Sequence, residues 1–277
     1  MKGSYPKIFQ DKERGAEAKK LFDDAQKMLA QIISEKWLTA KAVVGIFAAN
    51  QVGDDDIHLF PREGAEQKVK PIIFHTLRQQ TKKPSGQYNI ALADFILPLS
   101  SMNSEHRTDY IGAFACSTGF GIDEHVKKFE ADHDDYKAIM LKALADRLAE
   151  AFAECLHKKV RKEIWGYAKS ENLKNEDLIK EEYEGIRPAP GYPAQPDHLE
   201  KTTIWKLLDV EKNTGIVLTE SLAMFPTAAV SGLYFANKNS QYFGLGKITK
   251  EQVEDYAKRK EEDFEKIEKW LGPVLGY

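Results

Sequence analysis

The sequence has little of what would assign it at once to a class of protein. Only two of the 277 residues are cysteines, too few for a disulfide framework, so we expect a reducing compartment, the cytoplasm. The longest apolar run, Ala42 to Ala49, is too short to span a bilayer. Neither sign of charge dominates, with 40 Lys and Arg against 43 Asp and Glu, which gives no electrostatic reason to bind nucleic acid or an anionic membrane.

Several motifs that mark catalytic and cofactor sites are also missing. The sequence contains no G-x-G-x-x-G or Walker A loop for nucleotide phosphates, no H-E-x-x-H for zinc and no G-x-S-x-G elbow. Cys116 and Cys155 are too far apart for a C-x-x-C site. The lone G-x-G at Gly244 and Gly246 favours strand or turn geometry over a phosphate loop. The triplet 133–135 (HDD) favours a solvated polar patch or a helix break over a metal site. No metal ligand set is predicted.

What the sequence does have is enough apolar mass for a sizeable core, with 42% hydrophobic residues. Helical and strand patterns alternate irregularly, which favours a single α+β domain with a mostly antiparallel sheet flanked by long helices. The patterns predict helices at 13–37, 75–80, 123–162 with a break near His133, from Asn175, 197–212 and 249–271, strands at 41–49, 71–74, 110–116, 216–224 and 229–235, and turns at 50–56 and 117–121.

The most unusual segment is residues 185–198 (GIRPAPGYPAQPDH), which holds four of the eleven prolines. Each proline fixes its own φ and restrains the preceding residue, so the segment is stiff and extended. A stiff loop loses little entropy when a ligand binds, and Arg187 offers a planar fork for a carboxylate. Tyr192 offers an aromatic face. The alternative is a connector between helices, with Arg187 merely solvated.

These residues resemble the C-terminal activation domain of cobalamin-dependent methionine synthase. The family motif R-P-A-P-G-Y-P-A-C-P-x-H corresponds to Arg187 through His198, with Gln195 where a cysteine is common. Further matched segments extend over nearly the whole chain, among them 43–57 (VVGIFAANQVGDDDI), 109–115 (DYIGAFA), 133–136 (HDDY), 142–154 (KALADRLAEAFAE), 231–235 (SGLYF) and 252–260 (QVEDYAKRK). We expect residues 1–277 to form one such domain.

The resemblance implies a function that composition does not. The family's domain binds S-adenosyl-L-methionine and presents its methyl group to cobalamin, which a different domain of the enzyme supplies. An electron from flavodoxin, or a flavodoxin-like reductase, together with that methyl group reactivates the enzyme after cob(II)alamin has formed. The resemblance thus implies the activation domain of a methyltransferase in methionine biosynthesis. It implies no nucleic acid or membrane partner.

The resemblance also implies which residues contact S-adenosylmethionine. The motif's arginine and tyrosine carry over to Arg187 and Tyr192, and the aromatic pair after S-G-x-Y-F carries over to Tyr242 and Phe243. Glutamates within R-L-A-E and ahead of Y-x-G-I-R carry over to Glu150 and Glu181. The other aromatic pair, Tyr234 and Phe235, lies inside an apolar run and is predicted to pack in a strand.

A surface for the cobalamin domain is expected at the rim of the ligand cleft. The polar face of the helix at 123–147, including Asp146 and Arg147, is the candidate, and a solvated helix flank is the alternative.

The chain departs from the family pattern ahead of Tyr5, where a D-W-T-like segment with a ligand-contacting aspartate is usual. The zinc cysteines, the folate domain and the D-x-H-x-x-G cobalamin loop are not found either. We therefore expect a fragment or a separately encoded reactivation subunit that makes no methionine from homocysteine by itself. A second hypothesis is an interaction module that docks on a corrinoid domain and flavodoxin with little small-molecule binding. An independent small-molecule methyltransferase is disfavoured, because the acidic-glycine loop of that fold is absent.

Overall fold

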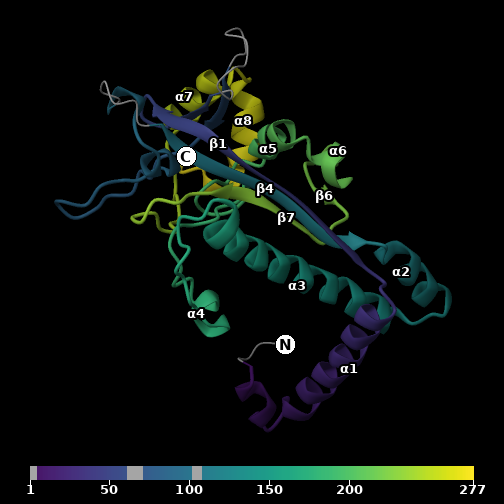
Figure 1. Ribbon diagram of the computed structural model, residues 1–277. Helices are drawn as coiled ribbons and strands as arrows, with labels where there is room; N and C mark the ends of the chain where they lie inside the picture. Colours follow the sequence, from purple (N-terminus) through teal and green to yellow (C-terminus); the bar gives the residue numbers. More distant parts are fainter. Residues whose placement is uncertain (1–4, 61–70, 102–107) are drawn as a thin grey trace.

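A five-stranded antiparallel sheet, in the order β3-β2-β1-β4-β7, forms the centre of the computed structural model (Figure 1). The structure describes residues 5–60, 71–101 and 108–277. The strands are β1 (Thr39–Val52), β2 (Asp56–Leu59), β3 (Ile72–His75), β4 (Asp109–Phe120) and β7 (Ala229–Tyr234), and β5 (Val217–Leu218) pairs with β6 (Met224–Phe225) in a separate two-stranded sheet. The predicted fold class, α+β with a mostly antiparallel sheet, is confirmed.

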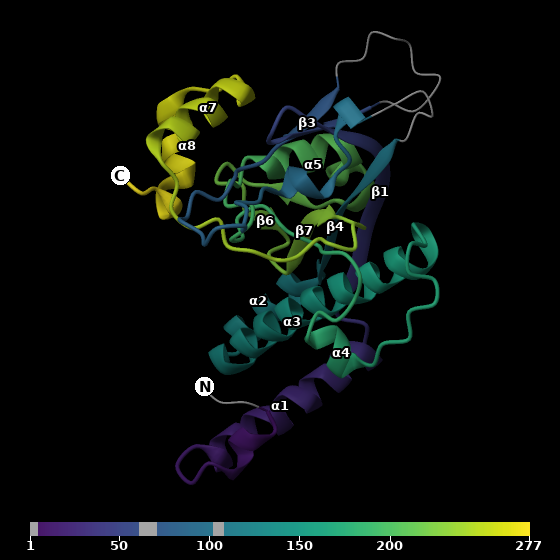
Figure 2. The ribbon, with the colours of Figure 1, turned by 90° about the vertical axis from the view of Figure 1, so that its left-hand side faces the viewer.

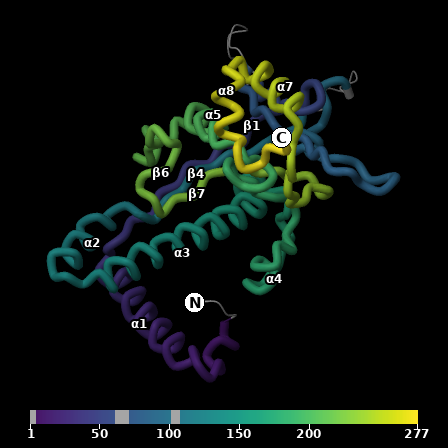
Figure 3. Tube along the Cα trace, turned by 180° about the vertical axis from the view of Figure 1, so that it is seen from behind, coloured from purple at the N-terminus to yellow at the C-terminus, as the bar shows by residue number. Residues whose placement is uncertain are grey.

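Helices cover both faces of this sheet. The longest helix, α3, runs along one face, and α5 and α6 lie on the other, while α1 lies beyond α3, away from the sheet (Figure 2). The chain ends near α7 and α8, at the far end of the molecule from α1 (Figure 3). The helices are α1 (Gly15–Ser34), α2 (Ile122–Ala131), α3 (Asp135–Lys159), α4 (Asn175–Ile179), α5 (Glu200–Leu208), α6 (Val210–Thr214), α7 (Lys250–Lys260) and α8 (Phe264–Leu271).

The central strands are buried on both sides, which explains their continuous apolar sequences. Side chains of successive strand residues point to opposite faces. Phe114 and Tyr234 therefore pack against Leu156 of α3, whereas Ala113 and Leu233 belong to the core cluster that includes α5. Because both faces need apolar residues, the strand pattern shows no polar alternation.

Several predicted boundaries were wrong because strands extend into polar or glycine-containing sequence. Residues 117–120 are not a turn but the end of β4, where the Ser117 hydroxyl donates to the Ala228 carbonyl (2.8 Å). The predicted turn at 50–56 contains the end of β1 and the start of β2. The predicted helix at 75–80 does not form, and those residues follow β3 as an irregular segment.

The other predicted helices are present, some of them divided into two. The break near His133 is confirmed, since α2 ends at Ala131 and α3 begins at Asp135. The helix predicted at 249–271 consists of two separate helices, α7 and α8. At the start of α7, the side-chain amide of Gln252 accepts from the backbone nitrogen of Arg78 (2.7 Å) and donates to its carbonyl (2.9 Å). The short helix α4 begins at Asn175, as predicted.

None of the helices in the described ranges combines the length and the apolar character that crossing a bilayer requires.

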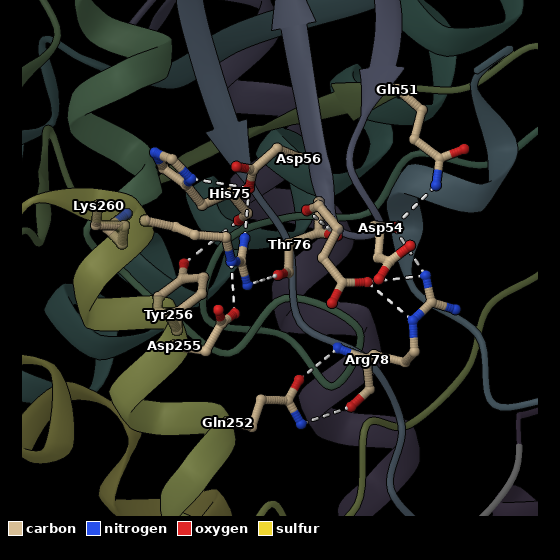
Figure 4. Close-up of polar contacts among 12 residues, drawn as sticks. Gln51, Asp54, Asp56, His75, Thr76, Arg78, Gln252, Asp255, Tyr256 and Lys260 are labelled. Atoms are coloured by element: carbon tan, nitrogen blue, oxygen red, sulfur yellow. Dashed lines mark hydrogen bonds and ion pairs between the residues drawn. The ribbon is translucent and has the colours of Figure 1, made fainter. Parts of the chain in front are cut away.

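A network of charged and polar groups, most of them half-buried, attaches α7 to the strands β2 and β3 (Figure 4). Arg259 donates to the carboxylate of Asp56, to the Thr76 carbonyl (3.1 Å) and to Asp255 on its own helix (2.7 Å). His75 contacts the same Asp56 oxygen through Nδ1 (2.9 Å). Figure 4 shows Gln252 reaching Arg78 from the same helix. Polar contacts thus fix α7 to the edge of the sheet at several points.

Lys260, at the end of α7, is the cation of a second group of charges, which is buried. Its ammonium lies 3.1 Å from Asp197 Oδ2 and also bonds Glu200 Oε1. The exposed fraction is 8% for the Lys260 side chain, 0% for Asp197 and 2% for Glu200. Tyr256 Oη donates to the same Asp197 oxygen (2.9 Å). Asp197 belongs to the proline-rich segment, so this ion pair joins that segment to α7.

We predict that Lys260→Met destabilises the protein strongly. Removing the cation leaves two buried carboxylates uncompensated, which costs about 3–5 kcal/mol of unfolding free energy. Urea denaturation followed by circular dichroism measures the loss. The matched control is Lys258→Met on the exposed side of α7, for which we expect a change within about 0.5 kcal/mol. Equal stability of the two variants would contradict the prediction.

Candidate functional site

The proline-rich segment starts beside the end of β7 and is held there by backbone hydrogen bonds. Ile186 and Phe235 exchange both backbone bonds at 3.0 Å, and Leu233 donates to the Pro188 carbonyl (2.9 Å). Gly232 makes this approach possible, since a Cβ at that position would lie 2.6 Å from the Pro188 oxygen. The segment then leaves the sheet.

The rest of the segment forms a compact turn that is anchored at its far end. Gly191 donates to the Gln195 carbonyl (2.7 Å), and Gln195 donates from its backbone to Tyr192 (2.9 Å). Gly191 has φ of +93°, and its missing Cβ leaves room for the His198 ring. The Gln195 amide donates to the His75 carbonyl (2.9 Å). Gln195 is thus a buried anchor of the loop at the position where the family often has cysteine.

A cavity of about 680 Å³ opens between this segment and α3. Its floor comes from β4 and β7, through Phe114 and Val230, and its walls come from α3, the proline-rich segment and the loop after β7. The volume lies within the range of small-molecule sites. The lining residues are Phe114, Glu150, Glu181, Arg187, Pro188, Ala189, Tyr192, Pro193, Ala194, Val230, Tyr242, Phe243 and Gly244.

All six residues predicted to contact the ligand line this one cavity, although they come from four separate parts of the sequence. Tyr192 is 58% exposed and Tyr242 is 39% exposed. The two acidic members, Glu150 and Glu181, are both exposed, on α3 and just after α4. These six residues therefore give the cavity one guanidinium, two carboxylates and three aromatic rings, in addition to the ring of Phe114. Their role as ligand contacts stays a prediction.

The other aromatic pair lies in the core, as predicted. Tyr234 and Phe235 are both fully buried. The Tyr234 ring stacks on Phe114 at 4.6 Å and on His157 at 5.0 Å between centroids. Asp146 and Arg147 are exposed on α3, and Asp146 lies one helical turn before Glu150. The described structure thus brings the proposed docking residues to the α3 side of the cavity.

Arg187 is not a freely solvated side chain. Its Nη2 pairs with Glu154 Oε2 (2.7 Å), and its Nη1 donates to the Tyr183 hydroxyl (2.9 Å) and to His157 Nδ1 (3.2 Å). Its backbone nitrogen donates to the Tyr242 hydroxyl (3.0 Å). The solvated connector that the sequence left open is therefore wrong, because this guanidinium is held in place by three side chains.

Sequence reasoning missed Glu154, His157 and Tyr183 as members of the site. The signal for the first two was present, since Glu150, Glu154 and His157 follow the i, i+4, i+7 spacing of one helix face. Tyr183 lies in the Y-x-G-I-R stretch that was used only to find Glu181. These three residues hold the arginine, which a search for ligand contacts alone does not find.

His157 is buried and uncharged. Burial, reinforced by the Arg161 and Arg187 guanidinium groups, lowers its pKa from 6.5 to about 2. A guanidinium can only donate, so Nδ1 is the acceptor and Nε2 carries the proton. Nε2 faces the Tyr167 hydroxyl at 3.4 Å. Arg161 itself is fully buried and forms a bidentate pair with Glu171 (2.6 and 3.0 Å).

In the described ranges of the chain, no three His, Cys, Asp or Glu side chains are grouped so that they could hold a metal ion.

We predict that His157 makes folding sensitive to acid. The unfolded chain binds a proton at His157 below pH 6.5, whereas the folded chain does so only near its lowered pKa of about 2. Stability is therefore complete above pH 6.5 and falls as the pH drops. Between pH 7 and pH 5 the wild type should lose about 2 kcal/mol more unfolding free energy than His157→Asn. Urea denaturation at both pH values measures this difference, and equal losses would contradict the prediction.

Comparison with known proteins identifies the family. A family model described as the activation domain of vitamin B12 dependent methionine synthase matches residues 1–261. A crystal structure of the MetH reactivation domain bound to AdoHcy is 53% identical to this chain, covers 100% of it and 83% of the other chain, and superimposes with a TM-score of 0.92. The chain therefore belongs to the activation domain family of vitamin B12-dependent methionine synthase, the family that its proline-rich motif resembles.

Proposed function

We propose that this chain binds S-adenosylmethionine in the cavity beside Arg187 and supports the reductive methylation of cob(II)alamin that reactivates methionine synthase. The observation that carries the proposal is the convergence of all six predicted contact residues on one cavity. The related reactivation domain was solved with AdoHcy, which is the product left when S-adenosylmethionine loses its methyl group. The family membership supports the same reaction.

The chemistry of the lining suits the three recognisable parts of S-adenosylmethionine. Two of the five N–H donors of Arg187, one at Nε and one at Nη2, have no partner among the described residues and can donate to the ligand's carboxylate in bidentate fashion. The carboxylates of Glu150 and Glu181 offer favourable electrostatics to the sulfonium and ammonium cations. Tyr192, Tyr242 and Phe243 offer faces for the adenine and for cation–π contact.

The protein supplies orientation, and the cobalamin cofactor supplies a cobalt centre that receives the methyl group together with one electron. We propose that the cobalamin is held by another domain of the same enzyme and that flavodoxin or a flavodoxin-like reductase is the electron donor. We propose that residues 1–277 form the activation domain, and that these residues by themselves do not make methionine from homocysteine. The proposed location is the cytoplasm.

Titration calorimetry with S-adenosylmethionine tests the binding proposal directly. Saturable heat supports it. An interaction module that docks on other proteins without a ligand of its own would give none.

We predict that Arg187→Ala weakens S-adenosylmethionine binding more than it weakens folding. Losing a charge-assisted contact should cost about 1.5–3 kcal/mol of binding free energy. Calorimetry gives the affinity, and a thermal melt gives the stability. Because the substitution also leaves Glu154 without its cation, Arg187→Ala combined with Glu154→Gln separates the two effects. Arg147→Ala, an exposed arginine on α3, is the control. Unchanged affinity with a large drop in melting temperature would make Arg187 structural.

A second prediction concerns the surface that meets the cobalamin domain. The methyl group must come within about 3–3.5 Å of the cobalt, so docking should occur at the cavity rim. Asp146 is exposed there, one turn from Glu150. Asp146→Lys should reduce reductive methylation of an added cob(II)alamin-loaded domain while calorimetry with S-adenosylmethionine stays unchanged.

The matched control for this prediction is Asp135→Lys, an acidic residue at the other end of α3. If methylation and ligand binding fall together, Asp146 belongs to the ligand site or the fold. If neither changes, the docking surface lies elsewhere.

A further inference from the structure

The guanidinium of Arg187 is held from one side by acceptors of two different kinds. Glu154 and His157 come from α3, one turn apart, and Tyr183 comes from the segment ahead of the proline-rich motif. Glu154 provides charge, whereas the imidazole Nδ1 and the tyrosine hydroxyl provide neutral acceptors. The side chain of Arg187 is 18% exposed. Its position therefore depends on these partners rather than on solvent.

His157 is itself fixed on every side. Its ring stacks on Tyr234 at 5.0 Å with an interplanar angle of 17° and meets the edge of Tyr183 at 4.8 Å and 80°. Nε2 faces Tyr167 at 3.4 Å. The residue has no exposed surface. A side chain so confined can hold a hydrogen-bond partner without giving up further conformational entropy.

We propose that His157 is a positioning residue for the ligand site, whose neutral Nδ1 holds Arg187 Nη1 so that Nε and Nη2 face the cavity. The inference rests on the proposed function, because the ligand carboxylate is what those donors would bind. A guanidinium fixed before binding loses less freedom when the carboxylate arrives. A histidine suits this position because it accepts at Nδ1 without adding a second negative charge beside Glu154.

The arrangement also explains why the histidine stays neutral. A protonated imidazole would place a third cation between Arg161 and Arg187 and would have no acceptor to offer Nη1. The remaining groups that face the ring are the hydroxyl of Tyr167 and the aromatic rings of Tyr183 and Tyr234. None of these groups carries a negative charge that would pair with a protonated ring.

The test compares two substitutions of the histidine. His157→Leu removes the acceptor, and we expect S-adenosylmethionine to bind about tenfold more weakly by calorimetry. His157→Asn keeps a carbonyl oxygen near the place of Nδ1 and should restore most of the affinity. Lys159→Ala, at an exposed residue two positions further along α3, is the control and should leave affinity unchanged.

A double-mutant cycle separates positioning from a general effect on the fold. In the Arg187→Ala background, His157→Leu should no longer change the affinity, because there is no guanidinium left to position. An equal loss in both backgrounds would overturn the proposal, and so would equal affinities of the Leu and Asn variants.

A measurement without ligand distinguishes failure of this inference from failure of the proposed function. Nitrogen NMR of the Arg187 side chain in the unliganded protein should show faster Nε–H exchange in His157→Leu than in wild type or His157→Asn. If the wild type binds no S-adenosylmethionine but the exchange rates differ as expected, the proposed function fails and the positioning role stands. Identical exchange rates in all three proteins would overturn the positioning role.

Discussion

The site depends on one short stretch of chain being held at both ends. At its beginning, the proline-rich segment is hydrogen-bonded to β7 through Ile186 and Pro188. At its end, Asp197 is buried against Tyr256 and Lys260 of α7. The prolines between these anchors restrict the backbone, so the turn has few alternatives to the conformation that lines the cavity. The sheet and α7 are therefore as much a part of the site as the residues that face the ligand.

Much of the fold could be predicted because the spacing of apolar residues along the sequence matches the period of the helices and the length of the buried strands. The apolar face of α3 and the break at His133 follow from helical spacing alone, and the buried strands follow from continuous apolar runs. The predicted element boundaries were wrong where tertiary contacts override the local secondary-structure preference of the residues. The sequence after Cys116 has serine, threonine and glycine, yet it continues as β4 because Ser117 and Thr118 find partners in Ala228 and Ala145 (2.8 and 2.9 Å). No local pattern predicts a partner so distant in sequence.

The site, like the fold, could be predicted only in part. The residues that line the cavity were found through a resemblance that extends over nearly the whole chain. Composition alone could not decide whether Arg187 is a ligand contact or a solvated side chain. The partners of Arg187 were not found, because Glu154 and His157 resemble ordinary helix residues until the loop is placed beside them. A motif indicates which side chains meet the ligand, whereas only the packing indicates what holds those side chains.

The charges around Arg187 are balanced so that a bound zwitterion can be accommodated. Glu154 offsets the guanidinium, Glu171 offsets the buried Arg161 behind it, and His157 between the two arginines is neutral. The cavity wall therefore carries no large uncompensated charge in its interior, while Glu150 and Glu181 remain exposed at its surface. Buried charges with partners are tolerated at low dielectric, and exposed carboxylates can attract a cation without a large desolvation penalty. This separation of paired charges in the interior from exposed carboxylates at the surface is what the proposed binding mode requires, in which Arg187 binds the carboxylate of S-adenosylmethionine and the exposed glutamates face its cationic groups.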